Sequence, residues 1–148
     1  MAKDKYKLVP ASYLILRNGN QVLLLKRANT GYEDGKYSMV AGHVEDGETF
    51  TDTAIREGLE EAGIRIYPED LKVAHVLQRR YGEGPLEQRI DVFFTAENWV
   101  GKIVNNEPHK CDALDWFDLD NLPENVIPYI KHVLECVKKG ISYSEFGW

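Results

Sequence analysis

The sequence has few cysteines and no long apolar run. Its two cysteines, Cys111 and Cys136, have neither metal-ligand spacing nor the density of a disulfide scaffold, so we interpret both as packing residues with free thiols. No apolar stretch approaches the roughly 20 residues of a membrane helix, and the opening MAKDKYKLVP lacks the apolar centre of a secretory signal. We therefore expect a cytoplasmic protein that does not bind a membrane.

Basic residues are also fewer than acidic ones. The 18 Lys and Arg residues face 24 Asp and Glu, and the resulting net charge of −6 argues against binding to a nucleic-acid duplex. Residues 42–63 hold seven acidic side chains and one basic one, so they carry the whole excess, and the other 126 residues balance at 17 of each sign. An anionic ligand would need a cation to approach this segment.

The overall composition is typical of a globular protein. The chain has 148 residues, of which 43% are hydrophobic and 28% are charged. We find no internal repeat, low-complexity tract or linker. The sequence therefore predicts a single domain over residues 1–148, present as a monomer or a homodimer.

Apolar, β-rich runs between turn residues predict most of a sheet. Asn-Gly-Asn at 18–20 predicts one hairpin turn and Gly-Glu-Gly-Pro at 82–85 predicts a second, whereas residues 28–36 have the composition of a loop. The predicted strands are Leu8–Arg17, Gln21–Arg27, Tyr37–Ala41, Leu71–Tyr81, Gln88–Ala96 and Ala113–Phe117.

A helix is predicted between the third and fourth of these strands, over Thr49–Ala62. Thr49 and Asp52 form a capping-box pattern at its start, and Gly63 is a natural stop. One face carries an apolar stripe, which we expect to pack on the sheet. The stripe consists of Ile55, Leu59 and Ala62.

A second helix is predicted from Pro123 to about Lys139, where Gly140 ends it. The tail Ile141–Trp148 receives no assignment. Strands interrupted by one helix and closed by another predict an α/β fold with a mixed sheet covered by helices.

Three glutamates of the first helix, Glu57, Glu60 and Glu61, are spaced i, i+3 and i+4, so they project from one face. Because the apolar stripe lies on the other side, we expect their carboxylates to point outward. One interpretation is an ordinary solvated face. The other is a hard-cation site, because Mg²⁺ and Mn²⁺ favour carboxylate oxygens and complete their shells with water and substrate phosphates.

The longer pattern that begins at Gly42 favours the cation site. It reads G-HVEDG-E-TFTDTAI-R-E-G-L-E-E-A-G-I and resembles the Nudix box of nucleoside-diphosphate-linked hydrolases, G-x5-E-x7-R-E-U-x-E-E-x-G-U, where U is bulky and apolar. Gly58 departs from the pattern, because the family usually has an aliphatic residue there, and glycine lowers helix propensity. The matching positions are Gly42, Glu48, Arg56, Glu57, Glu60, Glu61, Gly63 and Ile64.

The resemblance implies a complete Nudix domain, an α/β/α sandwich with a mixed central sheet and the box at residues 42–64. It also implies that Arg56 pairs with Glu48 and orients the metal-binding glutamates, a task that suits the fixed fork of a guanidinium. The implied ligands of Mg²⁺ or Mn²⁺ are Glu57, Glu60, Glu61 and the backbone carbonyl of Gly42.

The implied reaction is attack of water on a phosphorus of a diphosphate linkage, with a glutamate accepting the proton. That glutamate is Glu57 or Glu60 within the box, or Glu107 in a loop beyond it. We expect a nucleoside or deoxynucleoside triphosphate to be cleaved to a monophosphate and pyrophosphate. The alternatives are a dinucleoside polyphosphate or nucleotide-sugar hydrolase and a non-catalytic Nudix-fold ligand sensor, which degenerate box glutamates would favour.

Substrate contacts are predicted outside the box. Arg27, at the end of a strand, and Tyr32, in the next loop, could clamp a phosphate and stack on a base. Arg79 offers another cation where the family's ADP-ribose hydrolases have proline, and Tyr81 stands where its dinucleoside polyphosphate hydrolases have tyrosine. For these four residues and for Glu107, ordinary surface or core packing is the alternative interpretation.

Overall fold

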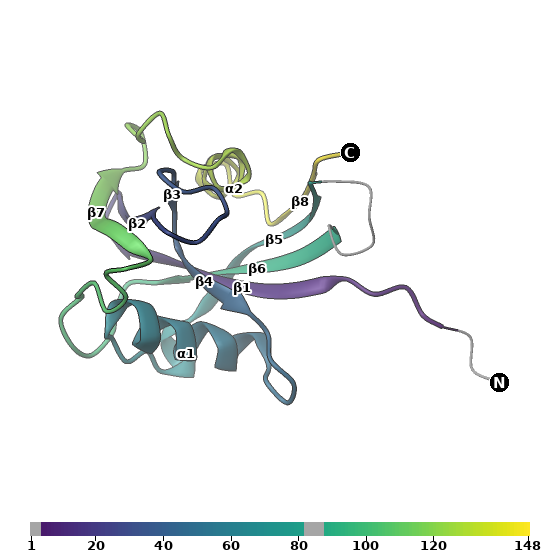
Figure 1. Cartoon of the computed structure of the whole chain (residues 1–148), viewed down its shortest axis with the longest axis horizontal. Coiled ribbons are helices and arrows are strands. Elements are labelled where there is room, and N and C mark those ends of the chain that lie inside the picture. Colours follow the sequence, from purple (N-terminus) through teal and green to yellow (C-terminus); the bar gives the residue numbers. More distant parts are fainter. Residues whose placement is uncertain (1–3, 82–87) are drawn as a thin grey trace.

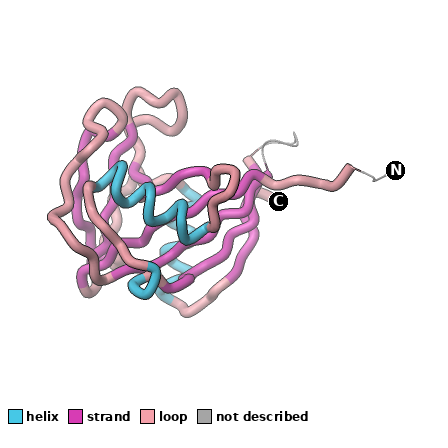
Figure 2. The backbone as a smooth tube through the Cα atoms, turned by 90° about the horizontal axis from the view of Figure 1, so that it is seen from below, coloured by secondary structure: helices cyan, strands magenta, loops and turns pink. Residues whose placement is uncertain are grey.

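A mixed sheet lies between two helices in the computed structural model of the protein, which describes residues 4–81 and 88–148 (Figure 1). Seen from below, α1 lies across the strands (Figure 2). The elements are β1 (Val9–Asn18), β2 (Gln21–Arg27), β3 (Tyr37–Ser38), β4 (Val40–His43), α1 (Phe50–Ala62), η1 (Pro68–Asp70), β5 (Lys72–Arg80), β6 (Gln88–Ala96), β7 (Cys111–Asp118), α2 (Pro128–Lys138) and β8 (Tyr143–Phe146).

Strand β1 lies at the centre of the sheet. It pairs in parallel with β6 and antiparallel with β4, and its end forms the predicted first hairpin with β2. Strand β5 is antiparallel to β6 and parallel to β8, while β2 pairs with both β3 and β7. The sheet is therefore mixed, as the sequence predicts.

Successive side chains of β1 point to opposite faces of the sheet. Tyr13 and Ile15 belong to the core beneath α2, whereas Leu14 and Leu16 belong to the core that α1 covers. The two helices lie on opposite faces in Figure 1. The layers are those of an α/β/α sandwich, which confirms the expected fold.

The ends of α1 are those that the local sequence predicts. Thr49 accepts a hydrogen bond from the Asp52 amide and donates its own amide to the Asp52 carboxylate, both at 3.0 Å, and Gly63 takes the left-handed conformation with φ of 67°. The predicted apolar stripe is wrong, because Leu59 is 51% exposed. The buried residues of the helix are instead Thr53, Ala54, Glu57, Gly58 and Ala62.

Small residues bring α1 close to the sheet. A β-carbon at Gly58 would lie 3.3 Å from Cδ1 of Leu14 and 3.2 Å from Cδ1 of Ile66, so this helix has no room there for the family's aliphatic residue. The close approach also carries Glu57 inward, where it is only 9% exposed. The expectation that all three glutamates point outward is therefore wrong for Glu57, and it is also wrong for Glu61, which accepts a hydrogen bond from the Ala41 amide of β4.

Two other predicted elements have different bounds. The predicted strand Tyr37–Ala41 divides into β3 and β4, which pair with β2 and β1 respectively. Helix α2 begins at Pro128 rather than Pro123, because the Asn125 carbonyl and the Ile127 amide are bonded to the backbone of Tyr37 and are not free for a helix. Proline at the first helical position loses no intrahelical bond.

The unassigned tail contributes a strand, since β8 pairs in parallel with β5. The predicted turn at 82–85 lies outside the described residues. Cys111 and Cys136 are buried and free, as predicted. In the described part of the chain, no helix has the length and apolar character needed to cross a membrane.

Candidate functional site

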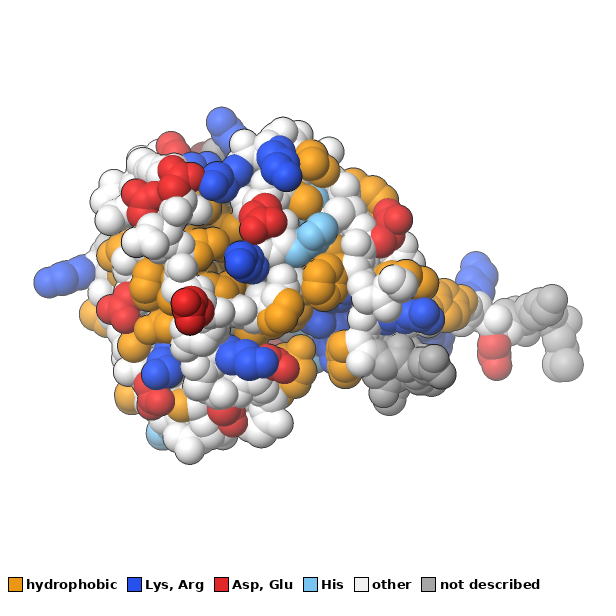
Figure 3. All heavy atoms as spheres, turned by 90° about the horizontal axis from the view of Figure 1, so that it is seen from above, with side chains coloured by type: hydrophobic (Ala, Val, Ile, Leu, Met, Phe, Trp, Pro, Cys, Tyr) orange, Lys and Arg blue, Asp and Glu red, His pale blue; other side chains and the backbone are white. Residues whose placement is uncertain are grey.

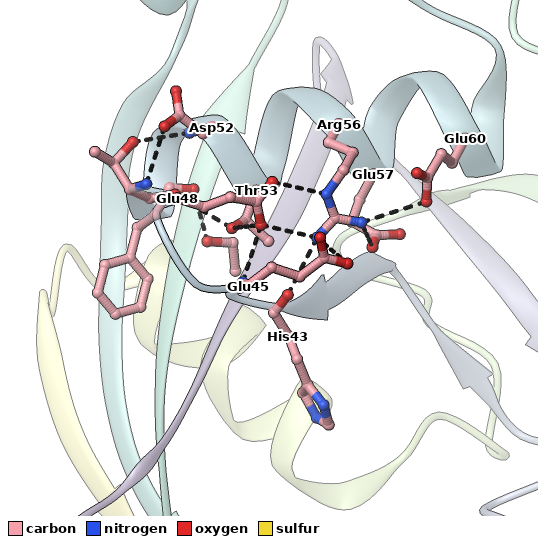
Figure 4. A network of polar contacts seen from close by, with 11 residues as sticks. His43, Glu45, Glu48, Asp52, Thr53, Arg56, Glu57 and Glu60 are labelled. Carbon is pink, nitrogen blue, oxygen red and sulfur yellow. Dashed lines mark hydrogen bonds and ion pairs between the residues drawn. The ribbon is translucent and has the colours of Figure 1, made fainter.

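The side chain of Arg56 connects α1 to the loop before it (Figure 4). Its Nε donates to Glu48 Oε2 at 2.8 Å and its Nη2 donates to Glu48 Oε1 at 3.0 Å, so two bonds fix the pair. Nη2 also donates to the His43 carbonyl at 3.2 Å. The hydrogen bonds from Arg56 lower the pKa of Glu48 to about 2, so this carboxylate is ionised at neutral pH.

Arg56 also contacts two of the three helix glutamates. Its Nη1 lies 2.6 Å from Glu57 Oε1 and 3.3 Å from Glu60 Oε2. Glu60 is exposed on the helix surface, whereas Glu57 points toward β4. The contact between Arg56 and Glu60 is therefore one of several that this guanidinium makes.

Glu57 and Glu61 lie together between α1 and β4. Their carboxyl groups are close enough for each to affect the pKa of the other, and the amide of Ala41 donates to Glu61 Oε2 at 3.3 Å. Burial raises the pKa of both carboxyl groups, and the contact with Glu57 raises the pKa of Glu61 further. Two acids held this close repel each other when ionised, so the pair favours a bound cation.

Gly42 lies against this pair. A β-carbon at position 42 would overlap the carboxyl group of Glu57, so only a glycine allows this approach. Carboxylate and backbone carbonyl oxygens are hard donors that suit Mg²⁺ or Mn²⁺. Within residues 4–81 and 88–148, no three His, Cys, Asp or Glu side chains form a ready cage for a metal. The donor set fits a cation that keeps several waters and takes further ligands from a substrate.

A cavity of about 100 Å³ lies beside Glu61. Its lining includes Glu61, Ala41, Arg27 and Glu107. Glu107 is thus brought to the acidic helix from a distant loop, and its nearest basic group, the Nζ of Lys110, is 3.7 Å away.

A second cavity, of about 380 Å³, shares Arg27 with the first. Four of the five predicted substrate contacts line it, and the fifth, Glu107, lines the smaller cavity. Sequence reasoning missed three lining residues. His43 directly follows Gly42, and Arg89 is the cross-strand partner of Arg79, a relationship that only the strand register reveals. Of the residues that the structure describes, those lining this cavity are Tyr13, Arg27, Tyr32, His43, Arg79, Tyr81 and Arg89.

Arg79 is 4% exposed, so it is buried in the protein while it also lines the larger cavity. Its Nε donates to Asp91 Oδ2 at 2.5 Å, and its Nη2 donates to the Tyr13 hydroxyl at 3.3 Å. The guanidinium also lies over the ring of Tyr129, 3.8 Å from its centroid. Burial raises the pKa of Asp91, and the charge of Arg79 opposes that rise.

Charge is distributed unevenly over the molecule. From the side of α2, acidic and basic side chains are mixed over the surface (Figure 3). The acidic excess lies in residues 42–63, which form the end of β4, the following loop and α1 on the other face. The acidic site is therefore a local feature.

The fold and this site define a class of α/β/α domains in which a loop and a helix present acids beside a mixed sheet. The NUDIX domain family model matches residues 7–135, and the chain belongs to this family. Its structure is similar to the MutT NUDIX hydrolase from Burkholderia pseudomallei, with a TM-score of 0.78 and 24% identity over 87% of this chain and 97% of that one. The MutT protein from Methanosarcina mazei Go1 gives a TM-score of 0.75 and 20% identity over 93% of this chain and 97% of that one.

Curated relatives extend this similarity to proteins of different length. The NAD-capped RNA hydrolase NudC of Stutzerimonas stutzeri is 30% identical over 79% of this chain, which spans 39% of the length of that protein. The uncharacterized Nudix hydrolase YvcI of Bacillus subtilis is 30% identical over 85% of this chain and 77% of its own length.

Proposed function

We propose that the protein is a Mg²⁺- or Mn²⁺-dependent hydrolase of nucleoside diphosphate-linked substrates. The observation that carries this proposal is the pair of Glu57, buried against the backbone of Gly42, and the partly buried Glu61 beside it, within a box that matches the family pattern at eight positions. The cation would be held by Glu57, Glu60, Glu61 and the Gly42 carbonyl. When bound, it neutralises phosphate charge and lowers the pKa of water.

Arg56 and Glu48 act in this proposal as positioning residues. Their paired hydrogen bonds join the loop to α1, and the contact from Arg56 to Glu57 holds that carboxylate in its inward direction. A lysine at position 56 would supply the positive charge, but it lacks the planar guanidinium group that contacts Glu48 and Glu57 at the same time.

The proton acceptor is assigned to Glu107 among the three candidates. It lines the same cavity as Glu61 but lies outside the box, so a cation held by the helix glutamates leaves its carboxylate free. Glu57 and Glu60 both contact Arg56 and are themselves proposed cation ligands, so their carboxylates are already engaged.

The first substrate class to test is a nucleoside or deoxynucleoside triphosphate, cleaved to a monophosphate and pyrophosphate. The second is a dinucleoside polyphosphate or a nucleotide sugar. It is supported by Tyr81 in the larger cavity and by the NudC relatives, which are named as hydrolases of NAD-capped RNA. A ligand sensor would have no need for the intact set of box glutamates.

A substrate screen tests this function. The chain is incubated with nucleoside triphosphates, dinucleoside polyphosphates and nucleotide sugars in Mg²⁺, Mn²⁺ or EDTA, and phosphate and pyrophosphate are measured separately. We expect metal-dependent release of a nucleoside monophosphate from at least one class, and its loss in Glu61→Gln. Ligand binding without any metal-dependent product would instead support the sensor.

A further inference from the structure

The larger cavity has a composition unlike the rest of the chain. Among the residues that the structure describes, its lining holds three arginines, three tyrosines and one histidine, and no acidic side chain. One buried carboxylate, that of Asp91, lies behind it and pairs with Arg79. Three guanidinium groups against one carboxylate leave an excess of positive charge, in a chain whose net charge is −6.

Arg89 is held in one wall of this cavity without a carboxylate partner in the described residues. Its Nη1 donates to Nε2 of His43 at 2.9 Å and its Nη2 donates to the hydroxyl of Tyr81 at 2.8 Å. The guanidinium lies 5.0 Å from the ring centroid of Tyr81, and its buried Nε has no acceptor among these residues. The contacts orient Arg89 but do not neutralise its charge, so this charge is available to an anion.

Arg27 supplies the second such charge. Its Nε donates to the Tyr32 carbonyl at 2.8 Å and its Nη2 donates to the hydroxyl of Thr30 at 3.1 Å, and both acceptors are uncharged. The nearby Asp34 carboxylate accepts hydrogen bonds from Thr30 and Gly31 instead. Arg27 is therefore fixed by its loop while its charge remains largely available.

Two tyrosines at the same cavity are partly exposed to solvent. Tyr32 is 38% exposed and Tyr81 is 53% exposed, and their ring centroids lie 6.1 Å apart with the planes tilted by 49°. Arginines lie over both rings, with Arg27 5.3 Å from the centroid of Tyr32 and Arg89 5.0 Å from that of Tyr81, and the rings are not stacked on each other, so the exposed part of each ring can contact a flat group. Nucleoside bases are groups of this kind.

The cavity adjoins the acidic site at two points. His43 lines it directly after Gly42, and Arg27 lines both cavities. A diphosphate needs a mediating metal cation to bind at the glutamates, whereas the arginine side chains of the larger cavity already supply positive charge. A single ligand that occupied both would therefore place its diphosphate at the glutamates and a second anion between Arg27 and Arg89.

We propose that the substrate carries a further phosphate group, outside the scissile diphosphate, that Arg27 and Arg89 bind while Tyr32 and Tyr81 contact the attached base. The inference rests on the proposed function, because it assigns the substrate class of the same site. The phosphate is attached either to the sugar or to the polyphosphate chain. Both sources present the same anionic oxygens, and matched ligands distinguish them.

The first measurement compares kcat/KM within pairs of substrates. NADP⁺ against NAD⁺ tests a phosphate on the sugar, and diadenosine tetraphosphate against diadenosine diphosphate tests phosphates in the chain. We expect a preference of about tenfold or more for the phosphate-rich member of one pair, as charge-assisted hydrogen bonds provide. Arg89→Gln and Arg27→Gln should each reduce that preference, and the exposed Arg65→Gln should retain it.

The second measurement is calorimetric binding of AMP, ADP and adenosine 2′,5′-bisphosphate in EDTA, which does not depend on turnover. The parent should bind one of the two bisphosphorylated ligands about tenfold tighter than AMP, and Arg89→Gln should lose this difference. Equal affinities in the parent, or a difference that both arginine variants retain, would overturn the inference. If no substrate is hydrolysed but the binding difference is present, the proposed function fails while the phosphate site stands.

Discussion

The carboxyl group of Glu57 lies directly against the backbone of Gly42. A β-carbon at position 42 would overlap the glutamate, so the first glycine of the box is required by the space that a buried acid occupies. The same contact puts a carboxylate next to the backbone of β4. The loop and the helix of the box therefore depend on each other for their geometry.

Gly42→Ala tests this dependence. Because the added methyl group displaces Glu57 or shifts β4, we expect a loss of about 1–3 kcal/mol in the free energy of unfolding, typical of overpacking. Activity should fall by about tenfold or more, because the ligand geometry at a metal site changes. Urea denaturation and kcat/KM measure the two effects.

Gly58→Ala is the matched control. Its methyl group would lie 3.3 Å from Cδ1 of Leu14, 3.2 Å from Cδ1 of Ile66 and 3.8 Å from Cγ1 of Ile64, all of them side-chain atoms. Alanine also gains about 1 kcal/mol of helix propensity over glycine. We expect stability within about 1 kcal/mol of the parent and full activity. Equal losses of activity in the two variants would show that the contact with Glu57 is not the reason for Gly42.

These two glycines also illustrate what local sequence can predict. The caps of α1 were predictable, because Thr49, Asp52 and Gly63 act within a few residues of the helix ends. The buried face was not, because the sequence prediction followed the largest apolar residues, such as Leu59. The helix instead packs through its smallest residues, which allow the closest approach to β1.

The candidate site also has a part that the sequence could predict and a part that it could not. The box is contiguous, so the residues around Arg56 could be listed from the sequence, although their inward and outward directions could not. The larger cavity depends on the register between β5 and β6, which sets Arg79 opposite Arg89, and on the parallel pairing of β1 with β6. Such long-range pairings leave no local pattern in the sequence. The tail residues that form β8 likewise have no local pattern that predicts a strand.

Glu61→Gln and Glu107→Gln should affect different steps. Glu61→Gln removes a proposed cation ligand, so we expect a fall of about 100-fold in kcat and a weaker apparent affinity for Mg²⁺. Glu107→Gln removes the proposed base, so kcat should fall by about 10²- to 10⁴-fold with the Mg²⁺ affinity unchanged. Initial rates against Mg²⁺ concentration separate the two. If Glu107→Gln keeps parental kcat, the base is one of the box glutamates.

Mg²⁺ should stabilise the protein by relieving the repulsion between Glu57 and Glu61. A ligand that binds only the folded state at ten times its Kd contributes about 1.4 kcal/mol, so we expect the melting temperature to rise by about 3–5 °C. NaCl at equal ionic strength controls for general screening, and Glu69→Gln controls for loss of an acid elsewhere. A response to Mg²⁺ no larger than the response to NaCl would argue against the site.

A histidine far from the acidic site should govern part of the pH dependence of stability. His75 in β5 is fully buried, and its Nδ1 lies 2.8 Å from the Ile141 carbonyl, to which it donates. Its Nε2 is 2.7 Å from the hydroxyl of Ser144 in β8, which is itself 2.9 Å from Nε2 of His132 in α2. The ring of Phe93 packs against it from β6. Burial, together with the nearby His132, lowers the pKa of His75.

The sign of the effect follows from this lowered pKa. Below about pH 6.5 His75 is protonated in the unfolded chain but stays neutral in the folded protein. The stability that the neutral ring contributes is therefore complete above that pH and is lost as the pH falls. We expect His75→Gln to be less stable than the parent at pH 7.5, and its deficit to shrink at pH 5.5. His109→Gln, which alters an exposed histidine, should keep the parental slope. Other groups also make stability depend on pH: the pKa of His43 is lowered, and the raised pKa values of Glu57 and Glu61 act in the opposite direction. All three proteins contain these groups, so their contributions cancel when the free energies of unfolding are compared. Urea denaturation at both pH values measures the deficit, and a deficit that stays constant would mean that His75 holds β8 without titrating.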